Sequence, residues 1–214
     1  MESAPPERIP VDLGLNRSSL KIKRAFDVVF AGIAIVLLAP IWLLIALAIR
    51  MSSRGPVIFR QIRVGRHGES FEMFKFRTMI DGAHAGRAAL DLLNESSGIF
   101  KLKNDPRLTV VGRLLRSTSL DELPQLINVL RGEMSLVGPR PLILEEDRLI
   151  EGIYRERLQL RPGMTGPWQA IGPVRPPLRG MVVIDCLYAE NWSLAAVLRA
   201  APPSPMLNRP RARR

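Results

Sequence analysis

The sequence is poor in the residues that build disulfide frameworks and zinc sites. Its 214 residues include one cysteine, Cys186, and two histidines, His67 and His84. One cysteine excludes an internal disulfide framework and a multi-cysteine metal site, and two histidines argue against a histidine-based zinc site. A single thiol is also typical of a protein in a reducing compartment.

Signatures of nucleotide and base binding are also missing or weak. The chain contains neither the G-x-G-x-x-G motif of dinucleotide-binding folds nor the G-x-x-x-x-G-K-[ST] motif of P-loop proteins. Any nucleotide must therefore be held by other means. Aromatic residues make up only 6% of the chain, which provides little surface for stacking the bases of a single strand. We therefore expect no nucleic-acid partner.

The charge of the chain is strongly unbalanced. Lysine and arginine number 31 against 20 aspartate and glutamate residues, a net charge of +11. A surplus of this size in a small chain indicates an anionic partner, which by charge alone is nucleic acid, phospholipid headgroups or a phosphorylated substrate. Solubility is the alternative explanation. Apolar residues at 47% are sufficient for the core of one domain.

One segment, residues 28–49, is apolar and uncharged. Its roughly 22 residues would form a helix of about 33 Å, long enough to cross the hydrocarbon core of a bilayer. A buried core helix is the less favoured alternative, because no polar residue interrupts the run. Cationic residues flank the run on both sides: Lys21, Lys23 and Arg24 before it, and Arg50, Arg54, Arg60, Arg63 and Arg66 after it.

The cationic flanks and Pro40 are compatible with two topologies of the membrane segment. Cationic flanks favour the cytoplasmic side, so a simple span would place one cluster on the wrong face. Pro40 lies near the middle and kinks a helix. A re-entrant helix that enters and returns to the same face satisfies both flanks, whereas a proline-tolerant span is the alternative. Asp27 precedes the run and either pairs with Lys23 and Arg24 or serves as a capping charge.

The remaining sequence predicts a mainly helical α+β fold with one short β-hairpin. Residues 56–59 and 71–77 are expected to be its strands, with a turn at 64–69, and the hairpin carries Arg60, Arg63, Lys75 and Arg77. Helices are expected at 81–93, 108–115, 120–130 and 142–158, a loop at 162–169, and strand or helix at 182–187. We divide the chain into a disordered lead (1–19), a membrane segment (20–50), a catalytic domain (51–200) and a disordered basic tail (201–214).

Two adjacent carboxylates, Asp121 and Glu122, are the most informative polar residues. Ser119 and Glu122 have the spacing of a capping box, which is the structural explanation of the pair. In that geometry Asp121 lies in the first helical turn, where the helix dipole favours an ionised side chain that can bind Mg²⁺ or act as a nucleophile. Arg116 is near in sequence, and Arg140, held between two prolines, is suited to gripping a phosphate.

These residues belong to a series of motifs that occur together in one family. The chain resembles the bacterial sugar transferases, the monotopic phosphoglycosyl transferases that start lipid-linked glycan assembly. The resemblance covers about residues 20–193. Its motifs are KRAFD (23–27), GPVIFRQ (55–61), RVG (63–65), FKFRTM (74–79), DPR (105–107), SLDELPQLIN (119–128), MSLVGPRP (134–141), RPGMTG (161–166), and Asp185 with Tyr188.

The resemblance implies a reaction and its residues. Asp121 would be the nucleophile and a ligand of the required Mg²⁺, with Glu122 as its partner. Asp121 would attack a UDP-sugar, release UMP and hold a phosphosugar, which polyprenyl (undecaprenyl) phosphate would then accept. The phosphates would be held by Arg116, Arg140, Lys75 and Arg77. Lys23, Arg24 and Asp27 would lie at the headgroup plane near the polyprenyl phosphate.

The resemblance also implies a location and a topology. The membrane segment would be a re-entrant helix–break–helix with Ala39-Pro40 at the break, where the family often has Ser-Pro. The catalytic domain would face the cytoplasm at the bacterial inner membrane, with membrane lipids and a second copy of the chain as candidate partners. The chain departs from the family pattern after residues 191–194, where the expected further helix is shortened or replaced.

Two other functional classes are weighed against this enzyme. A membrane-anchored basic protein that binds anionic lipid or nucleic acid explains the charge and the apolar run but leaves the Asp121-Glu122 pair without a role. An anchored metal-dependent hydrolase lacks the histidines common in such sites, although carboxylates alone could suffice.

Overall fold

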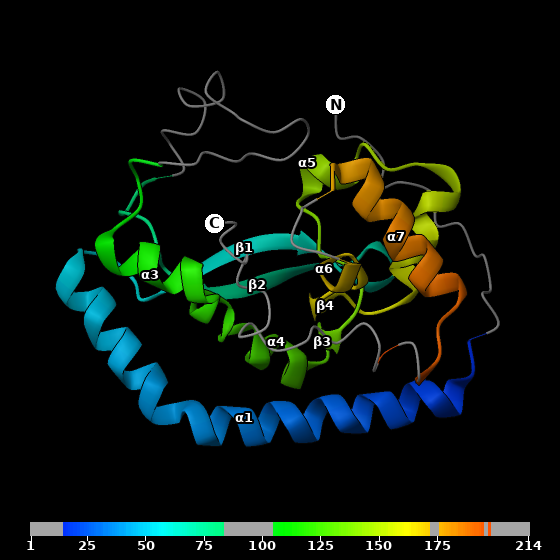
Figure 1. Cartoon of the computed structure of the whole chain (residues 1–214), viewed down its shortest axis with the longest axis horizontal. Coiled ribbons are helices and arrows are strands. Elements are labelled where there is room, and N and C mark those ends of the chain that lie inside the picture. Colours follow the sequence, from blue (N-terminus) through cyan, green and yellow to red (C-terminus); the bar gives the residue numbers. More distant parts are fainter. Residues whose placement is uncertain (1–14, 84–104, 172–175, 195–196, 198–214) are drawn as a thin grey trace, which may run out of the picture.

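The computed structural model describes residues 15–83, 105–171, 176–194 and 197, and Figure 1 shows their arrangement. The predicted tail, most of the predicted helix 81–93, residues 1–14 of the predicted lead and most of the segment after Leu194 lie outside these residues. The described elements are α1 (Arg17–Ser52), β1 (Ile58–Val64), η1 (Arg66–Gly68), β2 (Ser70–Phe76), α3 (Val110–Thr118), η3 (Leu120–Glu122), α4 (Gln125–Arg131), β3 (Ser135–Val137), α5 (Leu144–Asp147), η4 (Gly152–Gln159), β4 (Gly163–Thr165), α6 (Pro167–Ile171) and α7 (Leu178–Glu190), where η marks a 3₁₀ helix.

Helix α1 contains the apolar run. It begins before the predicted boundary at residue 20, because the side-chain oxygen of Asn16 caps it by accepting hydrogen bonds from the backbone N–H groups of Ser18 and Ser19. The helix then continues through Pro40 to Ser52. Figure 1 shows that α1 bends along its length, which is the usual effect of an internal proline. The predicted break at Pro40 is therefore a bend within a continuous helix.

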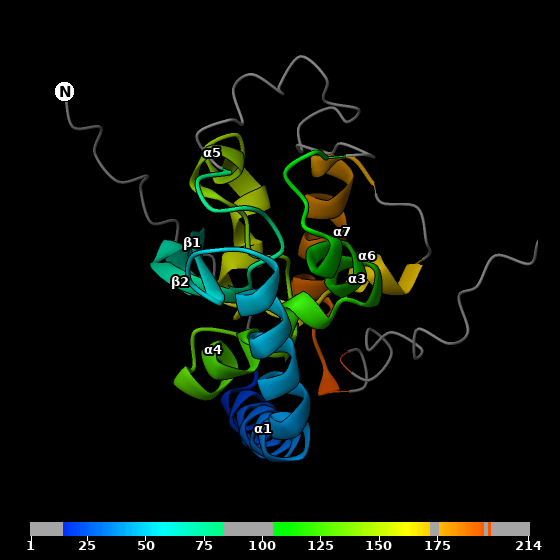
Figure 2. The same cartoon turned by 90° about the vertical axis from the view of Figure 1, so that its left-hand side faces the viewer.

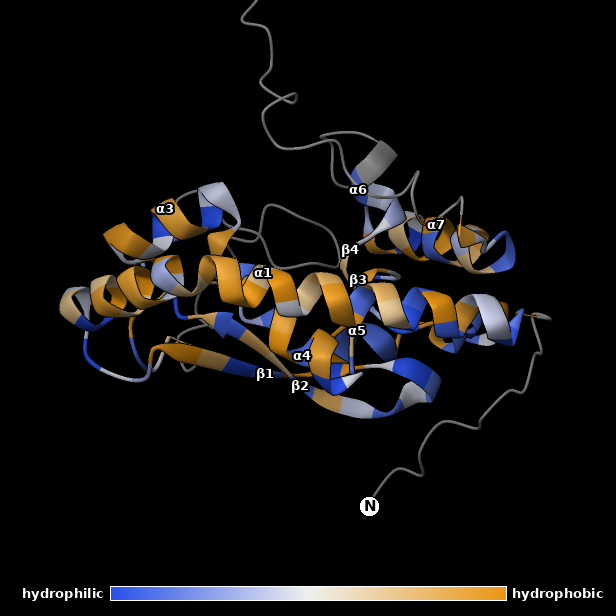
Figure 3. Ribbon diagram, turned by 90° about the horizontal axis from the view of Figure 1, so that it is seen from below, coloured by the Kyte–Doolittle hydropathy of each residue, from blue (hydrophilic) through white to orange (hydrophobic). Residues whose placement is uncertain are grey.

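The surface of α1 is mostly apolar and uncovered. By length and composition α1 could cross a membrane, and only 11% of its most apolar window is buried. A core helix of a soluble domain would be covered by its neighbours, so that alternative does not describe α1. Figure 3, seen from the α1 side, shows apolar residues along most of this helix, and Figures 1 and 2 show the other described elements on its opposite side.

Both halves of α1 pack against the rest of the chain. In the first half, Ala31 is fully buried against Leu126 and Val129 of α4. In the second half, Ile45 and Ile49 pack in a separate cluster, whose other buried members are Phe76 of β2 and Leu115 of α3. The two halves of this long helix are thus attached to the same folded unit.

The predicted β-hairpin is confirmed. Strands β1 and β2 are antiparallel, with Ile58 opposite Phe76 and Val64 opposite Ser70. The turn includes His67 in the left-handed region (φ 57°), beside Gly68. A second sheet was not predicted: β3 and β4 pair in parallel, within the segments that flank and follow Arg140. The expected loop 162–169 accordingly contains β4 and the start of α6.

The predicted helix at 120–130 is wrong in its first half. Ser119 has a left-handed backbone (φ 58°), so the chain turns there, forms the short helix η3 and starts α4 only after Pro124. The predicted helix at 142–158 is likewise divided into α5 and η4, whereas residues 182–187 are helical within α7.

Cys186 of α7 is buried and its thiol contacts the carbonyl oxygen of Tyr154, which indicates a structural role.

Gly112 allows α3 to lie directly on the segment that follows the hairpin. A Cβ at this position would be 1.8 Å from the backbone oxygen of Thr78, whereas a Cβ at Gly32 of α1 would meet nothing within 4 Å. We expect Gly112→Ala to lower the free energy of unfolding by about 1–3 kcal/mol through overpacking, although alanine is the better helix former. The matched control Gly32→Ala should not be destabilised, as measured by thermal unfolding in detergent. Equal midpoints for the two variants would contradict this account.

Candidate active site

A pocket of about 920 Å³ lies between the hairpin, α3, η3 and α6. It gathers residues that are distant in sequence, and both predicted carboxylates contribute to its lining. The structure brings together every residue predicted to attack or hold a phosphate: Lys75, Arg77, Arg116, Asp121, Glu122 and Arg140.

The turn at Ser119 presents the two carboxylates to this pocket. The backbone N–H of Ser119 closes the C-terminal end of α3, and its side chain makes no capping hydrogen bond to η3. The capping-box prediction for Ser119 and Glu122 is therefore wrong. The backbone of Glu122 instead donates a hydrogen bond to the carbonyl oxygen of Ser119, and the tight turn leaves Asp121 buried at 8% exposure.

Charges around Asp121 act in opposite directions. Burial raises the pKa of its carboxyl, Lys75 and Arg116 lower it, and Glu122 raises it. The net shift is upward, which contradicts the expectation that a helix N-terminus favours the ionised form. Glu122 is itself paired with Lys75, with 2.7 Å between Oε1 and Nζ, so the two carboxylates differ in their surroundings.

Two of the predicted phosphate-binding arginines already make specific contacts. Arg116 donates from Nε to the hydroxyl of Thr78 at 3.0 Å. Arg77 is buried and donates to the carbonyl oxygens of Ser53 and Arg54, just after the end of α1. Arg77 therefore joins the wall of the pocket to the C-terminal end of the membrane helix.

Arg140 is held at its backbone from behind the pocket. Its N–H donates to Oδ2 of Asp185 at 3.0 Å, and its carbonyl oxygen accepts from Nη2 of Arg157. Arg157 and Asp185 are almost fully buried and pair at 3.4 Å. With both backbone groups engaged, the Arg140 side chain is directed by a rigid support. The expectation that prolines restrict Arg140 thus misses the larger contribution of α7 and η4.

Asp121 and Glu122 are adjacent carboxylates in this pocket that could hold a metal, and Asp81 contributes a further carboxylate to the lining. Their carboxylate oxygens suit Mg²⁺, which typically takes one or two carboxylates and completes its shell with water and substrate phosphates. No cluster of three or more metal-ligating residues occurs among the described residues. The donor set thus fits Mg²⁺ shared with a phosphorylated ligand better than a metal enclosed by protein.

The predicted interface residues lie elsewhere. Lys23 pairs with Asp27 at 2.8 Å, and both bond to the hydroxyl of Ser135 on β3. Arg24 donates to the carbonyl oxygens of Val129 and Leu130 at the end of α4. None of the three predicted residues lines the large pocket. In this structure they attach α1 to β3 and α4.

Asn128 was not predicted as a positioning residue. It is fully buried, accepts from the N–H of Phe74 at 3.0 Å and donates to the carbonyl oxygen of Glu72 at 2.6 Å. These bonds fix β2 against α4 and so place Lys75 opposite Glu122. Its sequence signals are its place at the end of the motif 119–128 and an amide among the apolar residues 126–130. For Asp185, the signal is a lone carboxylate in the apolar stretch 181–189.

Comparisons with known proteins show the family of the chain. The sequence profile of the family described as "Bacterial sugar transferase" matches residues 18–200. The exopolysaccharide production protein ExoY of Rhizobium meliloti is 44% identical over 181 residues, which cover 82% of this chain and 80% of that protein. The UDP-glucose:undecaprenyl-phosphate glucose-1-phosphate transferase of Caulobacter vibrioides is 42% identical over 221 residues, covering 90% and 78%. The undecaprenyl-phosphate galactose phosphotransferase of Salmonella typhimurium is 42% identical over 186 residues, covering 84% of this chain but 38% of that protein.

The Asp185 carboxyl should give the support of Arg140 a measurable pH dependence. Burial raises its pKa to about 6 against the opposing charge of Arg157. A raised carboxyl pKa means that the folded state holds a proton the unfolded state has released, so stability falls as pH rises from about 4 to 6. We expect the thermal midpoint of the wild type to fall across this window relative to Asp185→Asn. Parallel curves would contradict the raised pKa.

Proposed function

Because this chain belongs to the bacterial sugar transferase family and is a transferase, we propose that it moves a sugar 1-phosphate from a UDP-sugar to polyprenyl phosphate. The observation that carries the proposal is one pocket in which the buried Asp121 and its neighbour Glu122 face Lys75, Arg116 and Arg140. Relatives named for glucose and for galactose support the reaction class but not one sugar.

We propose a two-step reaction through Asp121. In the first step a carboxylate oxygen of Asp121 attacks the β-phosphorus of the UDP-sugar. The bond from this phosphorus to the bridging oxygen breaks, and UMP leaves with that oxygen. In the second step an oxygen of polyprenyl phosphate attacks the same phosphorus, which restores the Asp121 carboxylate and forms polyprenyl-diphosphate-sugar. This order needs no external oxidant, reductant or water.

Charge placement supports this sequence. Phosphoryl transfer depends on positioning and on neutralising phosphate charge more than on acid–base groups. Arg140, supported at its backbone, and Arg116, held by Thr78, would bind phosphates on either side of the reacting atom. Lys75 stabilises the ionised carboxylates. Mg²⁺ bound by Asp121 and Glu122 would add further neutralisation of the diphosphate.

For the membrane we propose a re-entrant α1 with both ends on the cytoplasmic face of the bacterial inner membrane. The support is the bonding of Lys23 and Asp27, in the second and third turns of the helix, to Ser135 of β3, and the packing of Ile45 and Ile49, near its other end, against β2 and α3. A helix with ends on opposite faces could not make both sets of contacts. The bend at Pro40 and the two cationic flanks agree with this topology.

Replacement of the proposed nucleophile tests the function. We expect Asp121→Asn to lose UMP release by about 10³-fold or more, because the amide cannot form the acyl phosphate. The wild type, given a UDP-sugar and Mg²⁺ without polyprenyl phosphate, should gain the mass of one phosphosugar, and the variant should not. Chelation of Mg²⁺ should abolish UMP release by the wild type. The control Glu145→Gln removes an exposed carboxylate on α5 and should behave as wild type. If the Asp121→Asn variant also gained the mass of one phosphosugar, the assignment of Asp121 as the covalent nucleophile would be refuted.

The pH dependence of the rate provides a second, independent test. Because Asp121 must be ionised to attack, the acidic limb of kcat/KM should follow its pKa, which burial raises. Lys75→Met removes a charge that lowers this pKa, so the limb should move to higher pH. Glu122→Gln removes a charge that raises it, so the limb should move to lower pH. Shifts in the same direction would show that another group limits the rate.

A further inference from the structure

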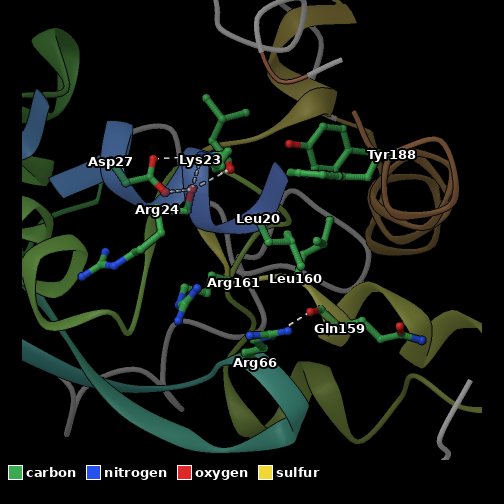
Figure 4. Close-up of a pocket in the computed structure, with 12 residues that line it drawn as sticks. Leu20, Lys23, Arg24, Asp27, Arg66, Gln159, Leu160, Arg161 and Tyr188 are labelled. Carbon is green, nitrogen blue, oxygen red and sulfur yellow. Dashed lines mark hydrogen bonds and ion pairs between the residues drawn. The ribbon is translucent and has the colours of Figure 1, made fainter. Parts of the chain in front are cut away.

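A second, smaller pocket lies beside the first half of α1 (Figure 4). Its lining comes from α1, η1, the segment before β4, and α7, and it shares no residue with the 920 Å³ pocket. The cations that line it are Lys23, Arg24, Arg66 and Arg161.

The three arginines of this pocket are positioned by neutral groups. Nε of Arg66 donates to the carbonyl oxygen of Gln159 at 2.8 Å, and Nε of Arg161 donates to that of Gly132 at 2.8 Å. Arg24 is held in the same way by carbonyl oxygens at the end of α4. Backbone carbonyls fix the direction of a guanidinium but do not neutralise its charge.

The positive charge of this pocket is poorly compensated. Its only carboxylate in the lining, Asp27, is engaged by Lys23, by the hydroxyl of Ser135 and by the N–H of Leu136. Within the described part of the chain, no ion pair joins a carboxylate to Arg24, Arg66 or Arg161. Burial, and then the charge of Arg161, lower the pKa of Arg66. A bound anion would relieve this repulsion.

Size and position narrow the class of anion. The pocket has a volume of about 30 Å³, which suits part of a phosphate group and not a nucleotide. Ile22 and Phe26, which alternate with its α1 residues, are exposed at 47% and 57% on the apolar surface of α1. The pocket is therefore at the edge of the membrane-facing surface, where lipid headgroups lie.

A buried hydroxyl adds a donor at the same place. Tyr188 of α7 is 7% exposed, and in Figure 4 its hydroxyl points toward the α1 side of the pocket. Burial raises its pKa, so the group stays protonated and can donate. The indole of Trp192 is its hydrogen-bonding neighbour, and because an indole N–H only donates, the hydroxyl proton is left for another acceptor.

We propose that Arg24, Arg66 and Arg161 bind the phosphate of an anionic membrane phospholipid, at a site separate from the catalytic pocket. The planar guanidinium groups match phosphate oxygens, and the apolar surface of α1 would receive the acyl chains. The proposal rests on the membrane location of α1 but not on the transfer reaction, so the failure of either can be recognised separately.

Lipid binding to the purified full chain tests this site. Native mass spectrometry in detergent would measure the retention of phosphatidylglycerol, of zwitterionic phosphatidylcholine and of polyprenyl phosphate in separate titrations. We expect Arg66→Gln and Arg161→Gln each to weaken phosphatidylglycerol binding about fivefold, the factor for roughly 1 kcal/mol per cation at a membrane surface. Binding of phosphatidylcholine should be weaker in the wild type and unchanged in the variants.

Control variants distinguish a specific phospholipid site from nonspecific electrostatic attraction between a cationic protein and anionic lipid. Arg148→Gln removes the same charge from an exposed position at the end of α5, an element on the side of the molecule away from α1 (Figure 1), and should leave retention unchanged. Arg66→Lys keeps the charge without the planar fork and should give an intermediate loss, which serves if Arg161→Gln unfolds. Equal losses in the Arg66→Gln and Arg148→Gln variants would overturn the proposal. A loss confined to polyprenyl phosphate would also overturn it, because the cations would then serve the substrate.

Discussion

The two separate contacts of α1 with the folded unit are the constraint on which the other features depend. An apolar helix of this length would normally be an independent membrane element, joined to its domain only by the chain. Here Ala31 completes one hydrophobic cluster with α4, and Ile49 completes another with β2 and α3. The hairpin that carries Lys75 and the turn that carries Asp121 lie between these clusters. The geometry of the pocket is thus set by elements that pack against both halves of α1.

The pocket places two carboxylates next to each other, which is electrostatically unfavourable. Asp121 loses hydration on burial, and its neighbour Glu122 repels it. Lys75 and Arg116 offset this cost, and each is oriented by a partner of its own. Arg140 is supported at its backbone N–H by Asp185 and at its carbonyl oxygen by Arg157. The site therefore relies on a surrounding shell that keeps cations in place before a phosphate arrives.

Local patterns were sufficient for some features and insufficient for others. Alternating residues at 71–77 predicted the hairpin, and the Asp121-Glu122 pair and Arg140 were identified from their motifs. The left-handed Ser119 could not be predicted, because the same spacing also forms a capping box, whereas here the Ser119 N–H closes the C-terminal end of α3. Strands β3 and β4 have three residues each, too few for an alternating pattern, and they pair through the close approach of Gly138 and Gly163. The roles of Arg77 and Asp185 arise from contacts between distant segments.

Arg77 has a consequence for the biosynthesis of the protein. Its guanidinium binds carbonyl oxygens just after α1 and also lines the catalytic pocket. Since α1 precedes β2 in the chain, the hairpin packs against a helix that is synthesised before it. A version of the chain without α1 would leave two hydrophobic clusters without their α1 members and would remove the helix that precedes the acceptors of Arg77. The packing of α1 is therefore part of the folded state of the described chain, and the elements that pack on α1 cannot be treated as an independent unit joined to it only by the chain.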